Sequence, residues 1–289
     1  MSGGALVPRP RYSKIDIFKK QTILLKNVMP KLLLIGDSLI SNLSLFPEIW
    51  KKYFLQHEAL NLGVRGDKTQ NVLWRIKNMT WPNTVSSIFI LSGTNNLGTD
   101  SPLEIAQSII LCGISARKYS PNIMVNIISL LPRDKWNSTK RNDIIHINKI
   151  LEKECIRNNL FFLDISKINW VLRNSELNTS LFYKDYLHLS KKGYVILSKF
   201  ITNSLHNQSR KIESKSKYQN PSNYEHDFPT LTKAKILTQT SNIKKVSKIT
   251  GQIFNPPTRS QTSPSSSSSS TSSSSSSICS TKPAPSTSS

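Results

Sequence analysis

Five short apolar segments, separated by amphipathic stretches, constrain the fold of this chain more than any other feature of its sequence. Each is four to nine residues long, which is the length of a strand rather than of a helix. Their nearly continuous hydrophobicity is typical of strands that are covered on both faces, as in a parallel sheet. The segments lie at residues 32–35, 60–64, 88–91, 123–131 and 160–165.

The stretches between these segments carry the signals of helices. Ser101 stands before Pro102, and Glu104 follows two positions later, which is the pattern of a capped helix start. Apolar residues recur at helical spacing over residues 142–156, and a last helix is expected over residues 191–205. Strands that alternate with helices in this way predict a doubly wound α/β domain of about 200 residues.

The composition changes near residue 206. Beyond it, nearly every residue from 265 to 277 is serine, and such a segment buries too little apolar surface to offset the entropy cost of ordering. The sequence therefore predicts three parts. They are an N-terminal extension over residues 1–29, a folded domain over residues 30–206, and a disordered basic and Ser-rich tail over residues 207–289.

Basic residues outnumber acidic ones in both parts of the chain. The whole chain carries 39 Lys and Arg against 17 Asp and Glu, which gives a net charge of +22. The net charge is +14 up to residue 205 and +8 from residue 206 onward. A chain of this kind favours an anionic partner or surface, and the tail is the candidate for contact with a polyanion such as RNA.

The cysteine content and the hydropathy of the chain indicate its cellular location. Cys112, Cys155 and Cys279 are too few for a disulfide framework and lack metal-ligand spacing, which fits a reducing environment. No apolar run approaches the roughly 18 residues of a membrane span. Residues 1–20 hold no continuous apolar segment of the kind found in a secretory signal. We therefore expect an intracellular, cytoplasmic protein without a membrane span.

Polar motifs follow the predicted strands at the edge where open parallel sheets bind their ligands. Each motif alone is ordinary loop chemistry, but together they supply a nucleophile, a base, a partner for the base and several hydrogen-bond donors. The motifs are Gly-Asp-Ser-Leu at residues 36–39, Gly-Val-Arg-Gly-Asp at 63–67, Gly-Thr-Asn-Asn at 93–96, and Asp-Tyr-Leu-His at 185–188.

Hydrolytic chemistry needs these residue types. A serine hydroxyl is a weak nucleophile at neutral pH, so Ser38 requires a base such as His188 to take its proton. Asp185 stands three residues before His188, so both can face the same way in a turn, with the carboxylate fixing the imidazole tautomer. The candidate donors to an oxyanion are the Ser38 and Gly66 backbone amides and the Asn95 side chain. Asp37, before the nucleophile, is expected to order the turn.

Together these blocks resemble the SGNH (GDSL) hydrolases, and most of all the catalytic subunits of platelet-activating factor acetylhydrolase IB. The resemblance covers about residues 30–205 and implies a three-layer α/β/α sandwich with a five-stranded parallel, flavodoxin-like sheet. It also implies no metal and no organic cofactor. The motifs that carry it, besides the blocks around Ser38 and Asn95, are residues 48–50, 61–75, 130–133 and 185–190.

Carried over by position, the resemblance assigns three sets of residues. It implies Ser38 as nucleophile, His188 as base and Asp185 as the partner of the base. It implies an oxyanion hole formed by the Ser38 amide, Gly66 and Asn95. It further implies an acyl pocket that is lined by Leu39, Thr94 and Leu187.

The sequence departs from the acetylhydrolase pattern in two places. Arg65 stands where these enzymes usually have a second glycine, so it either narrows the pocket or attracts an anionic group of the substrate. The long basic tail is absent from the compact acetylhydrolase subunits. This combination also resembles the esterase domains of some non-LTR retroelements, in which residues 93–98 and 182–185 have close parallels.

The leading hypothesis is a serine esterase that cleaves a small ester, with short acyl groups such as acetyl, through an acyl-enzyme intermediate. The alternative is a retroelement-derived, nucleic-acid-associated protein in which the esterase domain and the basic tail serve an interaction role. The intact set of Ser38, Asp185 and His188 favours the enzyme. A homodimer stays open.

Overall fold

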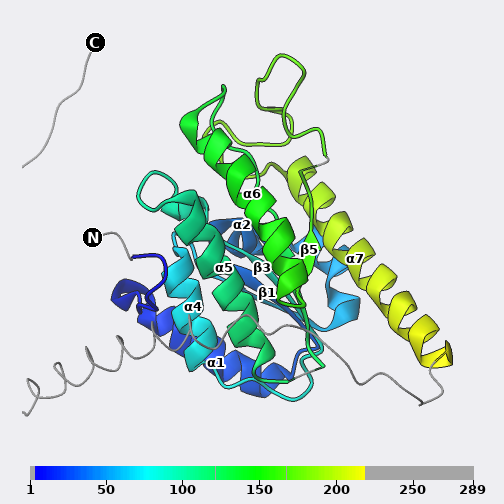
Figure 1. Cartoon of the computed structure of the whole chain (residues 1–289). Helices are drawn as coiled ribbons and strands as arrows, with labels where there is room; N and C mark the ends of the chain where they lie inside the picture. Colours follow the sequence, from blue (N-terminus) through cyan, green and yellow to red (C-terminus); the bar gives the residue numbers. More distant parts are fainter. Residues whose placement is uncertain (1–3, 121, 167, 219–289) are drawn as a thin grey trace, which may run out of the picture. The chain divides into compact units, whose positions relative to one another are not determined.

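The computed structural model describes residues 4–120, 122–166 and 168–218 (Figure 1). The tail predicted for residues 207–289 therefore lies, from residue 219 onward, outside the described residues. Within the described part, no helix is both long enough and apolar enough to cross a bilayer.

A five-stranded parallel sheet forms the centre of the domain. The strand order is β2-β1-β3-β4-β5, which is the order of a flavodoxin-like doubly wound fold. β1 and β3 are buried along their whole length, as expected for central strands with helices on both faces. All five predicted strands are confirmed, and their bounds are Leu32–Gly36 for β1, Ala59–Gly63 for β2, Ser87–Leu91 for β3, Met124–Ile128 for β4 and Phe161–Leu163 for β5.

Helices cover both faces of the sheet, which confirms the predicted three-layer sandwich (Figure 1). Each face has its own apolar core, because the side chains of a strand alternate between the two faces. One face is covered by α1 (Ile15–Val28), α4 (Thr69–Asn78), α5 (Pro102–Arg117) and α6 (Thr139–Arg157). The other is covered by α2 (Ser38–Ser41), α3 (Pro47–Tyr53) and α7 (Lys191–Tyr218). Short 3-10 turns lie at Tyr12–Lys14, Asn42–Leu45, Leu55–His57 and Thr94–Asn96.

The start of α5 has the capping box that its sequence predicts. The Ser101 hydroxyl accepts a hydrogen bond from the Glu104 amide at 3.3 Å. The Glu104 carboxylate accepts one in return from the Ser101 amide at 3.0 Å. Two backbone donors without a partner in the helix are thereby satisfied, which fixes where α5 begins.

Both ends of the domain differ from the expected boundaries. Residues before position 30 pack onto the domain, with Leu25 of α1 fully buried. The Ala5 carbonyl accepts a hydrogen bond from Ser108 at 2.6 Å. At the other end, α7 continues to Tyr218, beyond the predicted end of the domain at residue 206. In α1 only Gln21 and Leu25 are buried, so the sequence gives little signal that this helix joins the domain.

Candidate active site

The structure brings Ser38, His188 and Asp185 together at the carboxyl edge of the sheet. Ser38 is the first residue of α2, directly after β1, whereas Asp185 and His188 belong to the loop before α7. The Nε2 atom of His188 lies 2.9 Å from the Ser38 hydroxyl. Its Nδ1 atom lies 2.6 Å from a carboxylate oxygen of Asp185. This arrangement links a nucleophile, a base and the partner of the base by two hydrogen bonds.

The backbone of the loop before α7 wraps around the Asp185 carboxylate. Its second oxygen accepts hydrogen bonds from the Leu187 amide at 3.1 Å and from the His188 amide at 2.9 Å. Partial burial acts to raise the pKa of Asp185. The hydrogen bonds from His188 and Leu187 together outweigh it and lower that pKa. The carboxylate therefore stays ionised beside the imidazole at neutral pH.

Asp37 orders the turn that presents the nucleophile. One of its carboxylate oxygens accepts a hydrogen bond from the Leu39 amide at 2.9 Å, which caps the start of α2. The Asp37 side chain is fully buried, and this burial raises its pKa to about 7, although the Leu39 hydrogen bond acts in the opposite direction. The turn before Ser38 therefore contains a carboxyl group that titrates near neutral pH.

The predicted oxyanion donors lie on loops after three adjacent strands. Ser38 follows β1, Gly66 follows β2, and Asn95 follows β3. Gly66 has φ of +78°, a left-handed conformation that glycine adopts without strain. The Asn95 side-chain amide donates to the Asp67 carbonyl at 2.9 Å, which joins the second and third loops. An amide nitrogen carries two hydrogens, so one remains to face a substrate.

A buried arginine that sequence reasoning did not identify fixes the loop of Gly66. Arg75 of α4 donates to the Asp67 carboxylate at 2.8 Å. The same guanidinium donates to the Leu62 carbonyl at 2.8 Å and to the Gly36 carbonyl at 3.0 Å. It therefore joins the ends of β1 and β2 to the residue after Gly66. A fourth acceptor is the Gln21 side chain at 3.4 Å. Sequence spacing carries no signal of this role, since two of the four acceptors are backbone atoms.

The residues assigned to the acyl pocket lie around the same edge of the sheet. Leu39 of α2 is buried in the core, and Leu187 is half-buried and directly precedes His188 in the sequence. The carbonyl and hydroxyl oxygens of Thr94 accept hydrogen bonds from Arg133 at 3.1 and 3.3 Å. The Arg65 side chain is exposed, and its carbonyl accepts a hydrogen bond from Arg11 at 2.7 Å.

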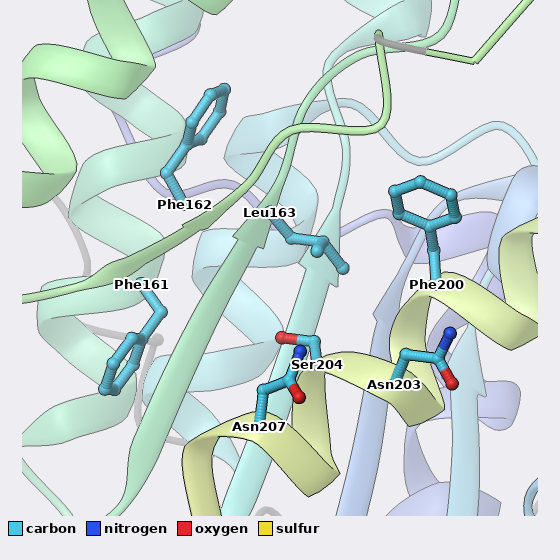
Figure 2. A pocket seen from close by; sticks show the side chains of 7 residues that line it. All are labelled: Phe161, Phe162, Leu163, Phe200, Asn203, Ser204 and Asn207. Carbon is cyan, nitrogen blue, oxygen red and sulfur yellow. The ribbon is translucent and has the colours of Figure 1, made fainter. Parts of the chain in front are cut away.

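Two cavities lie elsewhere on the domain. A groove of about 330 Å³ runs between β5 and α7, with Leu163 on the strand and Phe200 on the helix (Figure 2). A cavity of about 530 Å³ lies between the first turns of α6 and the loop after β5. Ser38, Asp185 and His188 line neither of them. Within the described residues, no cluster of three or more His, Cys, Asp or Glu side chains is arranged to hold a metal ion.

Curated relatives of the chain are acetylhydrolase subunits. The platelet-activating factor acetylhydrolase IB subunit alpha2 of Rattus norvegicus is 30% identical over 176 residues, which cover 60% of this chain and 75% of the relative. The alpha1 subunit of Homo sapiens is 30% identical over 171 residues, which cover 58% of this chain and 72% of the relative. No protein-family model matches the chain.

Solved structures of bacterial lipases share the fold. A GDSL-like lipase from Bacteroides thetaiotaomicron has a TM-score of 0.57 at 18% identity, over 67% of this chain and 97% of that protein. A lipase/acylhydrolase from Enterococcus faecalis has a TM-score of 0.51 at 17% identity, over 62% and 96% of the two chains. Sequence relatives and fold therefore agree with each other, and the chain belongs to the GDSL (SGNH) hydrolases, a family of carboxylic ester hydrolases.

Proposed function

We propose that the protein is a serine esterase that removes short, acetyl-type acyl groups from a small ester through an acyl-enzyme on Ser38. The observation that carries the proposal is the pair of hydrogen bonds at His188. One reaches the Ser38 hydroxyl at 2.9 Å and the other reaches Asp185 at 2.6 Å. A histidine placed between a hydroxyl and an ionised carboxylate is suited to accept the hydroxyl proton and to return it later.

The first half of the proposed reaction forms the acyl-enzyme. The Ser38 oxygen attacks the carbonyl carbon of the ester while Nε2 of His188 takes the hydroxyl proton. The carbonyl oxygen becomes negatively charged and is stabilised by the amides of Ser38 and Gly66 and by Asn95. When the tetrahedral intermediate collapses, the bond to the alcohol oxygen breaks and His188 gives its proton to that oxygen. The alcohol leaves, and the acyl group stays on Ser38.

The second half restores the enzyme with water. His188 takes a proton from a water molecule whose oxygen attacks the acyl carbon, and the same donors stabilise the second oxyanion. The bond to Ser38 then breaks, His188 returns the proton to the serine oxygen, and a carboxylic acid leaves. Throughout the cycle the Asp185 carboxylate stabilises the charged imidazole and keeps its proton on Nδ1.

The position of two leucines supports the preference for short acyl groups. Leu39 directly follows Ser38 and is buried, and Leu187 directly precedes His188 and is half-buried, so each of the two reacting residues has a leucine as its neighbour in the sequence. In an apolar pocket each methylene of the substrate changes the activation free energy by about 1–3 kcal/mol. A pocket bounded by two leucines therefore disfavours long acyl chains once they meet the wall.

Three further features belong to the proposal. We infer a reducing, intracellular location, which the buried free thiols of Cys112 and Cys155 support. We also infer that the basic tail contacts a polyanion such as RNA, supported by its net charge of +8 from residue 206 onward. The third inference is a homodimer, supported by the acetylhydrolase relatives, whose names describe them as subunits.

The proposal is tested by steady-state hydrolysis of p-nitrophenyl acetate, butyrate and octanoate by the full chain. We expect acetate to be the best substrate. Ser38→Ala and His188→Ala should each lower kcat by about 10³-fold or more, because both belong to one proton-transfer unit. Asp185→Asn should be milder than either. Circular dichroism of each variant checks that the fold is kept. Hydrolysis by Ser38→Ala at the wild-type rate contradicts the assignment of the nucleophile.

A further inference from the structure

Arg141, near the start of α6, is a buried arginine whose hydrogen-bond partners are backbone carbonyls. Its side chain is 5% exposed, and among the residues that the structure describes it is hydrogen-bonded to carbonyls and to no carboxylate. It donates from Nε to the carbonyl of Arg133 at 2.9 Å. From Nη2 it donates to the carbonyls of Asp134 at 2.6 Å and Lys135 at 3.0 Å. From Nη1 it donates to the carbonyl of Ser175.

This set of contacts ties two loops to one side chain. Residues 133–135 belong to the loop between β4 and α6, whereas Ser175 belongs to the long loop between β5 and α7. A guanidinium offers five N–H donors in a rigid plane, and four of them are used here. Only arginine can satisfy carbonyls that lie in several directions at once, because the lysine ammonium is a single nitrogen at the end of a flexible chain.

The loop over residues 133–135 also contacts both sides of the catalytic site. The Asp134 amide donates to the carbonyl of Tyr186 at 2.9 Å, and Tyr186 stands between Asp185 and His188 in the sequence. On the opposite side, the Arg133 guanidinium donates to the Thr94 carbonyl at 3.1 Å, beside the oxyanion residue Asn95. A continuous chain of hydrogen bonds therefore runs from Arg141 through Asp134 to the loop of the base.

The backbone is strained at the junctions of this chain. Asp134 has φ of +67°, Ser175 has φ of +67°, and Tyr186 has φ of +52°, so three non-glycine residues adopt the left-handed conformation. Such residues persist only where the surrounding contacts hold them, and they gather at functional sites. Two of the three, Asp134 and Ser175, are held directly by Arg141, and the third is held by Asp134.

We propose that Arg141 is a positioning residue for the esterase reaction: by fixing residues 133–135 it holds the backbone of Tyr186 and thereby the orientation of Asp185 and His188 toward Ser38. The inference rests on the proposed roles of Asp185 and His188. A positioning role differs from a role in stability alone. It requires that the rate of the catalytic step and the geometry of the His188 imidazole change when the four carbonyls lose Arg141 as their donor.

The test compares full-chain Arg141→Lys with two control variants in the same helix. Arg141→Lys keeps the positive charge but cannot satisfy four carbonyls. Ile147→Val removes a methyl group from a fully buried side chain of α6. It serves as the control for a loss of stability that leaves the hydrogen bonds of Arg141 in place. Arg157→Lys makes the same exchange at an exposed arginine paired with Glu154. Each variant is measured by thermal unfolding, by kcat and KM with p-nitrophenyl acetate, and by ¹H,¹⁵N NMR of the Nδ1 proton of His188, assigned with His188→Gln.

We expect Arg141→Lys to lower kcat at least tenfold with KM changed less than threefold, and to shift or broaden the Nδ1 proton signal. Both controls should keep kcat and the signal even where Tm falls. If Arg141→Lys lowers Tm as Ile147→Val does but leaves kcat and the signal unchanged, the positioning role is overturned. If the wild type hydrolyses no ester and the signal is still lost only in Arg141→Lys, the positioning of His188 stands and the proposed reaction fails.

Discussion

At the scale of single residues, the size of the acyl group that the protein accepts should depend on Leu187. Its backbone amide donates a hydrogen bond to the Asp185 carboxylate at 3.1 Å, which fixes the backbone from which the Leu187 side chain extends. We expect Leu187→Ala to move the best p-nitrophenyl ester from acetate toward butyrate or longer, because the variant removes three carbons from the wall of the pocket. The gain should be about tenfold or more in kcat/KM per methylene newly accommodated, since each is worth roughly 1–3 kcal/mol.

Leu172→Ala is a suitable control for this variant, because that leucine is also in a loop but is 44% exposed. It should leave the chain-length profile unchanged. A wild-type profile that already peaks at eight carbons or more would show that Leu187 does not bound the pocket.

The proposed catalytic residues could be found from the sequence because their side chains carry the chemistry, and the structure brings them together as the motifs suggest. Ser38, Asp185 and His188 are the residue types that nucleophilic hydrolysis requires, and the motif positions place them at strand ends. The arginines that support them could not be predicted in this way. Two of the four acceptors of Arg75 and all four acceptors of the Arg141 side chain are backbone carbonyls, which are the same at every position of a sequence and therefore give no pattern.

At the scale of elements, the short helix α2 presents the nucleophile and depends on a carboxyl group at its start. Burial raises the pKa of Asp37 to about 7, from an ordinary value of 3.8 in the unfolded chain. Between these two pH values the folded state holds a proton that the unfolded state has lost. The free energy of unfolding therefore falls as the pH rises through this window, by about 4 kcal/mol when three pKa units are converted at roughly 1.4 kcal/mol each.

Asp37→Asn should remove this dependence. An asparagine keeps an oxygen that accepts the Leu39 hydrogen bond but does not titrate. Urea unfolding at pH 5 and pH 8 measures the free energy of unfolding of both proteins. We expect the difference, Asp37→Asn minus wild type, to be more positive at pH 8 than at pH 5. Ser41→Ala in the same helix changes a side chain that does not titrate, so this variant should differ from the wild type equally at both pH values. The same stability difference for Asp37→Asn at pH 5 and pH 8 would contradict burial as the cause.

The elements themselves followed from the sequence wherever burial is complete. The fully buried strands β1 and β3 coincide with apolar runs, and α5 begins at its predicted cap. The sequence was less informative for α1, whose two buried residues, Gln21 and Leu25, are one turn apart and too few to form a clear pattern. It was also less informative for the end of α7, because residues 207–218 contain only two hydrophobic residues, Ile212 and Tyr218, and so have no apolar stripe.

At the scale of the whole molecule, hydrolysis and contact with a polyanion should separate along the chain. The proposed catalytic residues lie within the described domain, whereas residues 219–289 carry seven Lys or Arg and two acidic residues. A chain that ends at Tyr218 keeps all of α7 and should hydrolyse p-nitrophenyl acetate with kcat/KM within twofold of the full chain. Its affinity for single-stranded RNA should fall. The slope of log K against log salt should also become shallower by up to about 5, because each lost phosphate contact removes about 0.7.

A full-length variant with those seven Lys and Arg changed to Gln separates charge from length. It should bind RNA as weakly as the chain that ends at Tyr218, since counterion release depends on charge and not on the number of residues. Equal RNA affinity and equal salt slopes in all three proteins would show that RNA binds to the domain and not to the tail, because the basic residues of the domain are present in each protein. Loss of hydrolysis in the shorter chain with an unchanged circular dichroism spectrum would instead show that residues beyond 218 contribute to the active site, and the two activities would then share one part of the molecule.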